Sequence, residues 1–196
     1  METLTTLMID FWQITLVAGL VIIGAVINFI DKDFTTSMTF KSKEMPHMKP
    51  ISIPTKGKGF WGAIWMWLMA TRTWEITKDF HFSINGENFI IPKGFVFDGA
   101  SIPKFLHTWL SPVGVLLMGG LVHDYAYKYT VLLKKGKKGA SDVMTQAEAD
   151  VTFRDINIEV NGFRLLNYLA YYALKLGGFF AWNGHRKVGA DWKETI

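Results

Sequence analysis

The chain contains no cysteine among its 196 residues. Disulfide bonds, zinc sites with thiolate ligands and cysteine nucleophiles are therefore excluded. Charged residues are also scarce, at 19% of the chain with a formal net charge of +4, and there is no internal repeat or low-complexity segment. By contrast, 49% of the residues are hydrophobic and 15% are aromatic, which is enough to build a packed core.

The cationic residues are dispersed except for one run, Lys134-Lys135-Gly136-Lys137-Lys138. A run this short is typical of a solvated basic loop, so we expect no specific binding of nucleic acid. The same loop would suit an anionic membrane surface.

An uncharged run of 20 residues extends from Phe11 to Ile30. As a helix it would span about 30 Å, the thickness of a bilayer core. No basic segment precedes the run and no small-x-small site follows it, which argues against a cleaved signal peptide. We therefore expect a transmembrane anchor over residues 1–31. The lysines that follow predict a single-pass membrane protein with a cytoplasmic C-terminal domain.

Beyond the anchor, residues 32–58 are polar and contain three prolines and several lysines, which predicts a linker. Residues 59–196 then form one globular α+β domain. The segment Gly59–Ala70 is rich in tryptophan but too short to span a bilayer. It is expected to be a helix, either in the core or an interface, or with its aromatic face at the level of lipid headgroups.

Within this domain the pattern predicts a small β-hairpin or sheet packed on three to four α-helices. Strand alternation runs over 72–84 and returns over 89–97, with a turn at 85–88. Helices are expected over 112–133, 145–160 and 164–176. The second begins with the capping box Thr145…Glu148 and ends at Gly162. Gly119 and Gly120 each cost about 1 kcal/mol in a helix interior, so a neighbour should pack closely there.

The strongest chemical signal is His123-Asp124 inside an apolar run, with Asp150 on the next predicted helix. Buried charges need partners or a metal. Asp150 could hold one imidazole nitrogen and leave the other as a base, while Tyr127 shares a helix face with His123. Asp98 and Asp124 are candidate oxygen ligands for calcium or another hard divalent cation.

Three motifs carry a family resemblance: GFVFDGASIP at 94–103, LVHDYAY at 121–127 and EADVTF at 148–153. Together with the aromatic segment at 178–182, they resemble a domain-of-unknown-function family common in tailed bacteriophages and prophages. The resemblance covers roughly residues 72–182 and implies a phage-type protein, located in a membrane or a virion. It implies no particular activity.

The same residues are similar to the core of calcium-dependent secretory phospholipases A(2). That resemblance implies that His123 activates water, that Asp124 binds calcium, and that Asp150 and Tyr127 orient the imidazole. Asp98 would correspond to the acid of the calcium loop in the bacterial members. The chain departs from that class because it has no disulfides and because its loop at 97–101 differs from the usual glycine-rich one.

These observations predict a metal-assisted hydrolase of an envelope component, with a phospholipid ester as the favoured substrate. The expected partners are the lipid bilayer and this substrate, with a homo-oligomer or virion partners left open. The alternative is a non-enzymatic phage membrane or virion protein that acts in envelope penetration, lysis or superinfection exclusion.

Several residues have alternative interpretations. The His-Asp cluster could be a purely structural network completed by Arg154 or Ser101. His107 would be an additional ligand in a metal-dependent phosphohydrolase, and Ser101 would be the nucleophile in a serine hydrolase, although no nucleophile-elbow pattern surrounds it. The remaining histidines are assigned to the surface or the linker: His47, His81 and His185.

Overall fold

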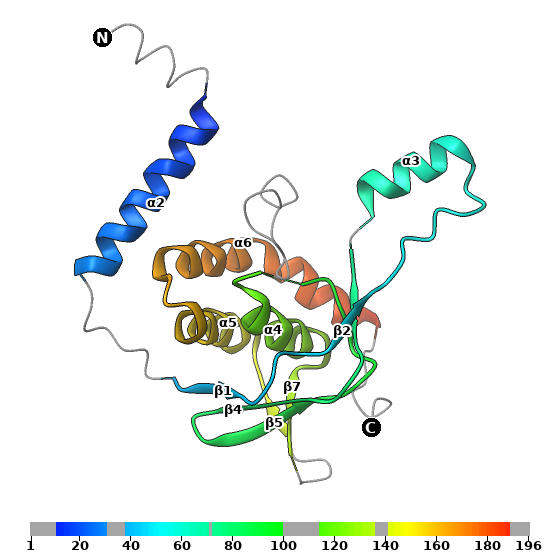
Figure 1. The fold of residues 1–196 in the computed structure, drawn as a ribbon. Helices are drawn as coiled ribbons and strands as arrows, with labels where there is room; N and C mark the ends of the chain where they lie inside the picture. Colours follow the sequence, from blue (N-terminus) through cyan, green and yellow to red (C-terminus); the bar gives the residue numbers. More distant parts are fainter. Residues whose placement is uncertain (1–10, 31–37, 71, 100–113, 136–140, 189–196) are drawn as a thin grey trace, which may run out of the picture.

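The computed structural model describes residues 11–30, 38–70, 72–99, 114–135 and 141–188 as a mixed α+β fold (Figure 1). Its helices are α2 (Trp12–Ile30), α3 (Gly59–Met69), α4 (Leu117–Tyr129), α5 (Gln146–Asn161) and α6 (Arg164–Val188). Its strands are β1 (Phe40–Ser42), β2 (Met48–Pro50), β3 (Trp74–Ile76), β4 (Phe80–Ile84), β5 (Glu87–Ile91), β6 (Val96–Phe97), β7 (Val131–Lys134) and β8 (Ser141–Val143).

The strands form two antiparallel sheets, one in the order β1-β4-β5-β7-β8 and the other in the order β2-β3-β6. The predicted hairpin is confirmed at β4–β5, but its turn contains only Asn85 and Gly86. Both residues have positive φ, 51° and 86°, as a two-residue type I′ turn requires. The turn is therefore shorter than predicted, and Glu87 already belongs to the second strand. The arms expected over 72–84 and 89–97 are each divided between the two sheets, because β3 and β6 pair with each other in the smaller one.

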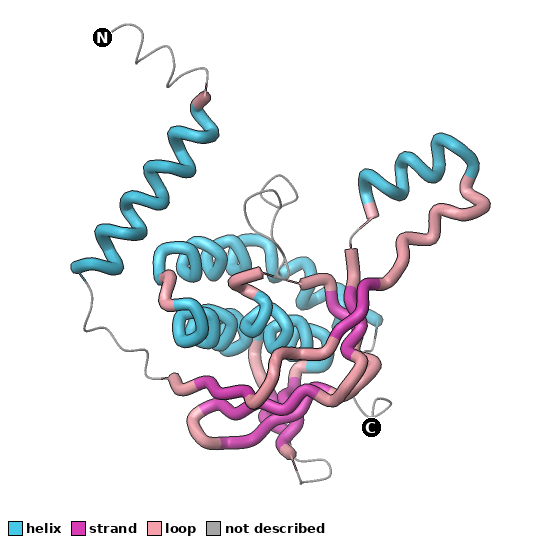
Figure 2. The backbone as a smooth tube through the Cα atoms, in the orientation of Figure 1, coloured by secondary structure: helices cyan, strands magenta, loops and turns pink. Residues whose placement is uncertain are grey.

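The core forms where the large sheet meets the helices, and Figure 2 shows α4, α5 and α6 gathered on one side of the strands. Phe82 and Phe89 are paired across β4 and β5, with stacked rings 5.6 Å apart. Nearly every residue of α4 is buried. The helix that carries the His-Asp pair is thus enclosed by the sheet on one side and by other helices on the other.

Two segments differ from the sequence predictions. The helix expected over 112–133 ends at Tyr129, where Thr130 adopts a left-handed conformation (φ 61°). The residues after it instead pair with β5 as strand β7, because their apolar side chains are buried in the sheet. The predicted linker at 32–58 contains β1 and β2, which are held by backbone pairing to β4 and β3.

The helix boundaries around the candidate site follow the sequence signals more closely. The capping box of Thr145 and Glu148 is present at the start of α5, and Gly162 caps its end with a φ of 67°. Gly119 also behaves as predicted: a Cβ there would lie 2.5 Å from the carbonyl oxygen of Phe153. The glycine therefore permits close packing of α4 on α5. The helix α6 continues to Val188, twelve residues beyond its predicted end at 176.

The N-terminal segment requires a correction. Within the described part of the chain, none of the helices has the length and hydropathy needed to traverse a bilayer. This finding contradicts the predicted anchor over 1–31 and the single-pass localisation with a cytoplasmic C-terminal domain. The uncharged run does form α2, but Gly24 is buried on the domain, where a Cβ would lie 2.6 Å from the Phe163 ring. The run thus packs on the segment that leads into α6.

The tryptophan-rich segment forms α3, as predicted, and this helix stands away from the body of the protein (Figure 1). Phe60, Trp61 and Trp65 are 72%, 78% and 65% exposed. These three side chains therefore do not contribute to the core.

Candidate active site

His123 is placed by α4 against α5, where only 3% of the residue is exposed. Its Nε2 atom lies 3.0 Å from Oδ1 of Asp150, a residue that is itself 2% exposed. The two helices approach closely because of Gly119, whose backbone N–H donates to the side-chain oxygen of Asn157 on α5 at 3.1 Å. The His-Asp pair is therefore part of a tightly packed helix interface.

Tyr127 lies one helical turn after His123 and completes this arrangement. Its hydroxyl donates to the same Oδ1 atom of Asp150 at 2.5 Å, and its ring lies 3.9 Å from the imidazole between centroids. Gly178 of α6 is packed against that hydroxyl. Gln146, at the start of α5, also forms a side-chain hydrogen bond with Tyr127. The ring is thus held from three helices.

These contacts determine which imidazole nitrogen carries the proton. A carboxylate accepts hydrogen bonds and cannot donate them, so the nitrogen that faces Asp150 must be the donor. In neutral His123 that nitrogen is Nε2, and Nδ1 then has the lone pair. Nδ1 lies 3.5 Å from Oδ1 of Asp124, which is too long for a strong hydrogen bond. Nδ1 is therefore the nitrogen available to act as a base.

Burial and charge act in opposite directions on the imidazole. Burial lowers the pKa of His123, but its hydrogen bonds with Asp124 and Asp150 and their negative charges more than compensate, so the pKa is raised overall. Burial also raises the pKa of the Tyr127 hydroxyl, and the bond to Asp150 adds to this effect. Tyr127 consequently remains a neutral donor, while His123 is a stronger base than a histidine in water.

Asp124 is an unusual carboxyl group. Burial raises its pKa to about 7, against the lowering effect of the hydrogen bond with His123. Asp98, in the loop after β6, raises this pKa further through its negative charge and, when one of the two carboxyl groups holds a proton, through a hydrogen bond between them. Oδ2 of Asp124 is buried and has no hydrogen-bond partner in the described part of the chain. An orphaned oxygen facing a second carboxyl group fits a hard cation or a shared proton.

A larger metal cluster is not found: among the described residues, no group of three or more His, Asp or Glu side chains is arranged to hold an ion. Asp98 and Asp124 thus form a two-carboxylate pair. Calcium also accepts carbonyl oxygens and water as ligands, so two carboxylates are compatible with its chemistry.

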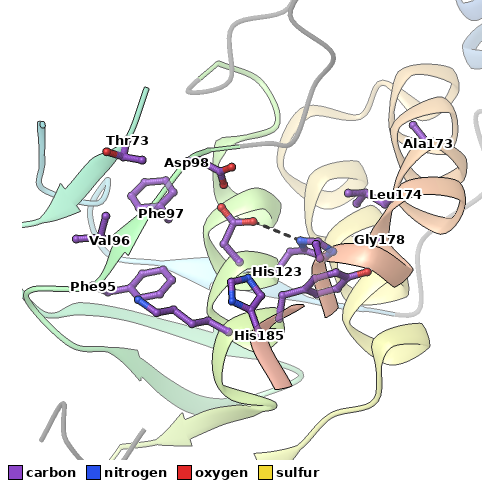
Figure 3. A pocket seen from close by; sticks show the side chains of 14 residues that line it. Thr73, Phe95, Val96, Phe97, Asp98, His123, Ala173, Leu174, Gly178 and His185 are labelled. Carbon is purple, nitrogen blue, oxygen red and sulfur yellow. Dashed lines mark hydrogen bonds and ion pairs between the residues drawn. The ribbon is translucent and has the colours of Figure 1, made fainter. Parts of the chain in front are cut away.

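A cavity of about 450 Å³ opens beside the histidine, and Figure 3 shows His123, Asp98 and His185 around it. One wall is formed by Phe95 and the two residues of β6, and the opposite wall by α6, including Leu174 and Gly178. The polar side chains are His123, Asp124, Asp98, Tyr127, Lys128, His185 and Thr73. The cavity is therefore apolar on two sides and polar where the His-Asp pair lies.

The structure brings together His123, Asp124, Tyr127 and Asp150, with Asp98 beside Asp124. Arg154, one of the two residues expected to complete a purely structural network, is bonded to Asp155 at 2.7 Å. Ser101 and His107 lie outside the described residues.

The other described histidines differ in their exposure and in their position relative to the cavity. The His47 side chain is 55% exposed, as expected, and His81 is half-buried in β4. His185, however, lines the cavity and does not belong to a linker. Sequence reasoning missed it because α6 was predicted to end at 176. The same early end concealed the role of Gly178, although the aromatic segment at 178–182 was a signal that this region packs.

Comparisons with known proteins identify a family for this chain, but that family has no assigned activity. A family model described as "Protein of unknown function (DUF1353)" matches residues 74–174, a range that begins at β3 and ends within α6. It includes His123, Asp124, Tyr127, Asp150 and Asp98. No curated protein and no solved structure gives a significant match.

Proposed function

The chain belongs to the DUF1353 family of proteins of unknown function, and we propose that its His123–Asp150 site hydrolyses an ester bond in a phospholipid. The observation that carries this proposal is the 3.0 Å contact between His123 Nε2 and Asp150 Oδ1 on the wall of a cavity. A histidine held in one tautomer by a buried carboxylate is a suitable general base.

In this proposal Nδ1 of His123 takes a proton from a water molecule in the cavity. The resulting hydroxide attacks the ester carbonyl. Asp150 stabilises the imidazolium that forms, and Tyr127 keeps the Asp150 carboxylate in place. The raised pKa of His123 supports this role, because a more basic nitrogen removes the proton more readily. The tetrahedral intermediate then loses its ester C–O bond, and the proton passes from Nδ1 to the departing alkoxide, which leaves as an alcohol.

Asp98 and Asp124 would hold a hard divalent cation, with calcium proposed, and backbone carbonyls or water would provide the remaining ligands. Such an ion would polarise the ester carbonyl and stabilise the charge that develops on its oxygen. The buried, unpartnered Oδ2 atom of Asp124 supports this assignment. Protein ligands for the ion would therefore come from the loop after β6 and from α4, next to the proposed base.

The choice of a phospholipid depends on the cavity walls. Phe95, Phe97 and Leu174 provide apolar surface for an acyl chain, next to the polar side chains that would act on its ester. We include the phage association in this proposal, because a phage-type protein would meet such esters in the host envelope. A water-soluble ester without an acyl chain would leave these walls uncovered.

The test measures fatty-acid release by the full chain from vesicles of phosphatidylglycerol and phosphatidylcholine, with calcium or with a chelator. We expect release that depends on calcium and falls by at least about 100-fold in His123→Ala, the lower end of what a general base contributes. His47→Ala is the matched control, because its side chain is exposed and does not line the cavity. It should retain full activity.

Circular dichroism and thermal unfolding of each variant establish that the proteins compared are folded. No release by the folded wild-type protein, with calcium present, would contradict the proposal and leave the cluster with a structural role. Release that is equal in wild type and His123→Ala would do the same. Release that continues in chelator but is lost in His123→Ala would support His123 as the general base and contradict the role proposed for the metal ion.

A further inference from the structure

The exposed face of α3 has no role in the proposed hydrolytic site. Trp61 and Trp65 are four residues apart and therefore share one side of the helix, and Phe60 lies beside Trp61 with their rings 5.2 Å apart in an edge arrangement. All three side chains are more than half exposed. Large aromatic residues gathered on a helix that stands away from the core indicate a binding surface.

The charges around α3 have one sign. Between Met45 and Trp74 the chain contains no Asp or Glu. Lys56 and Lys58 immediately precede the helix and Arg72 follows it, and all three are exposed. The aromatic side chains are thus bordered by cations at both ends of the helix. A complementary partner must provide apolar material beneath a layer of negative charge.

We propose that α3 binds the surface of an anionic lipid bilayer, with Phe60, Trp61 and Trp65 in the headgroup region. Aromatic side chains favour that depth because it offers both apolar and polar surroundings. Lys56, Lys58 and Arg72 then contact lipid phosphates, where each cation adds to the attraction. The 11 residues of α3 lie parallel to the surface and do not cross it.

This proposal does not depend on the activity of the His123 site, because it concerns binding only. If both hold, α3 would keep the cavity close to its substrate. Each proposal can fail without the other. Binding to vesicles without release of fatty acid would support the proposal for α3 and contradict the one for the His123 site. Release of fatty acid without contact between α3 and the vesicles would do the reverse.

The lack of cysteine makes a site-specific test straightforward. Trp61→Cys in the full chain gives a single thiol, which can be labelled with the environment-sensitive fluorophore NBD. Val143→Cys is the matched control, because Val143 on β8 is also 78% exposed and apolar but has no place on α3. We expect NBD at position 61 to brighten and shift to the blue on phosphatidylglycerol vesicles, and NBD at position 143 to remain unchanged.

The charge contribution is tested by Lys56→Gln together with Lys58→Gln in the labelled Trp61→Cys protein. Partitioning onto phosphatidylglycerol should fall about 25-fold, since each lysine near an anionic surface contributes about a fivefold factor. High salt should have the same effect, whereas phosphatidylcholine vesicles should bind weakly from the start.

Three outcomes would overturn the proposal. The first is no spectral change at position 61 on anionic vesicles, and the second is an equal change at positions 61 and 143. The third is a change at position 61 that appears without vesicles and rises with protein concentration, because that would assign the aromatic face to a second copy of the chain.

Discussion

The hydroxyl of Tyr127 donates to the same oxygen of Asp150 that His123 contacts, at 2.5 Å and 3.0 Å respectively. One carboxylate oxygen therefore receives two buried donors from successive turns of α4. The Tyr127 hydroxyl therefore holds the oxygen that the imidazole contacts. Tyr127 thereby sets the position of His123 without needing to touch a substrate.

Removal of the Tyr127 hydroxyl should destabilise the fold and also loosen the position of Asp150 relative to His123. We expect Tyr127→Phe to lower the free energy of unfolding by about 1.5–3 kcal/mol, the range for hydrogen bonds to charged groups. Tyr125→Phe is the control, because its hydroxyl is also buried on α4 but has no hydrogen-bond partner in the described chain. That change should be neutral or stabilising. Urea unfolding of both variants decides the matter, and equal losses would contradict the prediction.

A second prediction concerns Gly178, where an added Cβ would collide with the Tyr127 hydroxyl and lie 3.1 Å from the Gln146 side chain. Gly178→Ala should therefore displace Tyr127 from Asp150 and destabilise the fold by about 1–3 kcal/mol. In a Tyr127→Phe background the colliding atom is gone, so the same change should cost less. A double-mutant cycle measured by urea unfolding gives the coupling, and strictly additive effects would show that the two residues act independently.

The third prediction concerns the contact between α4 and α5. Gly119→Ala should destabilise the protein by about 1–3 kcal/mol, because the new Cβ would lie 2.5 Å from the Phe153 carbonyl oxygen, a backbone atom that cannot turn aside. Gly184→Ala is the control in α6, since nothing lies within 4 Å of its added Cβ. There the better helix propensity of alanine should add up to about 1 kcal/mol. Measured by thermal unfolding, the melting temperature should fall in Gly119→Ala and rise in Gly184→Ala.

The fourth prediction is a pH dependence with a defined sign. Folding raises the pKa of Asp124 from 3.8 to about 7 and also raises that of His123 above 6.5. Both groups bind protons more tightly in the folded state, so their contribution to stability is lost as pH rises. For Asp124 the loss occurs between its ordinary pKa of 3.8 and about 7. For His123 the loss begins above 6.5.

Asp124→Asn removes the titration of that carboxyl group while keeping its shape. In chelator, we expect unfolding free energy to decrease between about pH 5 and pH 8 in the wild-type protein and to decrease less in the variant. Urea titrations at the two pH values provide the comparison. The same decrease in both proteins would mean that Asp124 does not carry the proton.

The local signals in the sequence were reliable where a few adjacent residues determine the structure. The Thr145 capping box, the Asn85-Gly86 turn and the close approach at Gly119 all appear in the structure. The proximity of His123 and Asp150 could also be anticipated, because a buried histidine and a buried carboxyl group on neighbouring helices stabilise each other.

Features that depend on distant parts of the chain could not be read in this way. The residues at 131–134 have an apolar pattern that continues a helix, and only pairing with β5 makes them a strand. The uncharged run at 11–30 has the composition of a membrane anchor. Its composition gives no sign that Gly24 packs against Phe163, a residue far along the chain. His185 lines the cavity because α6 continues to Val188, whereas the sequence pattern predicted that the helix ends at residue 176.

The described residues between the two halves of the site include two paired strands. His123 and Asp150 are 27 positions apart, and the intervening β7 and β8 pair with each other and, through β7, with β5. This pairing shortens the effective loop that must close, which lowers the entropy lost when the carboxylate meets the imidazole. Substitutions that break the β7–β8 pairing should therefore weaken the His123–Asp150 contact by lengthening the loop that it closes.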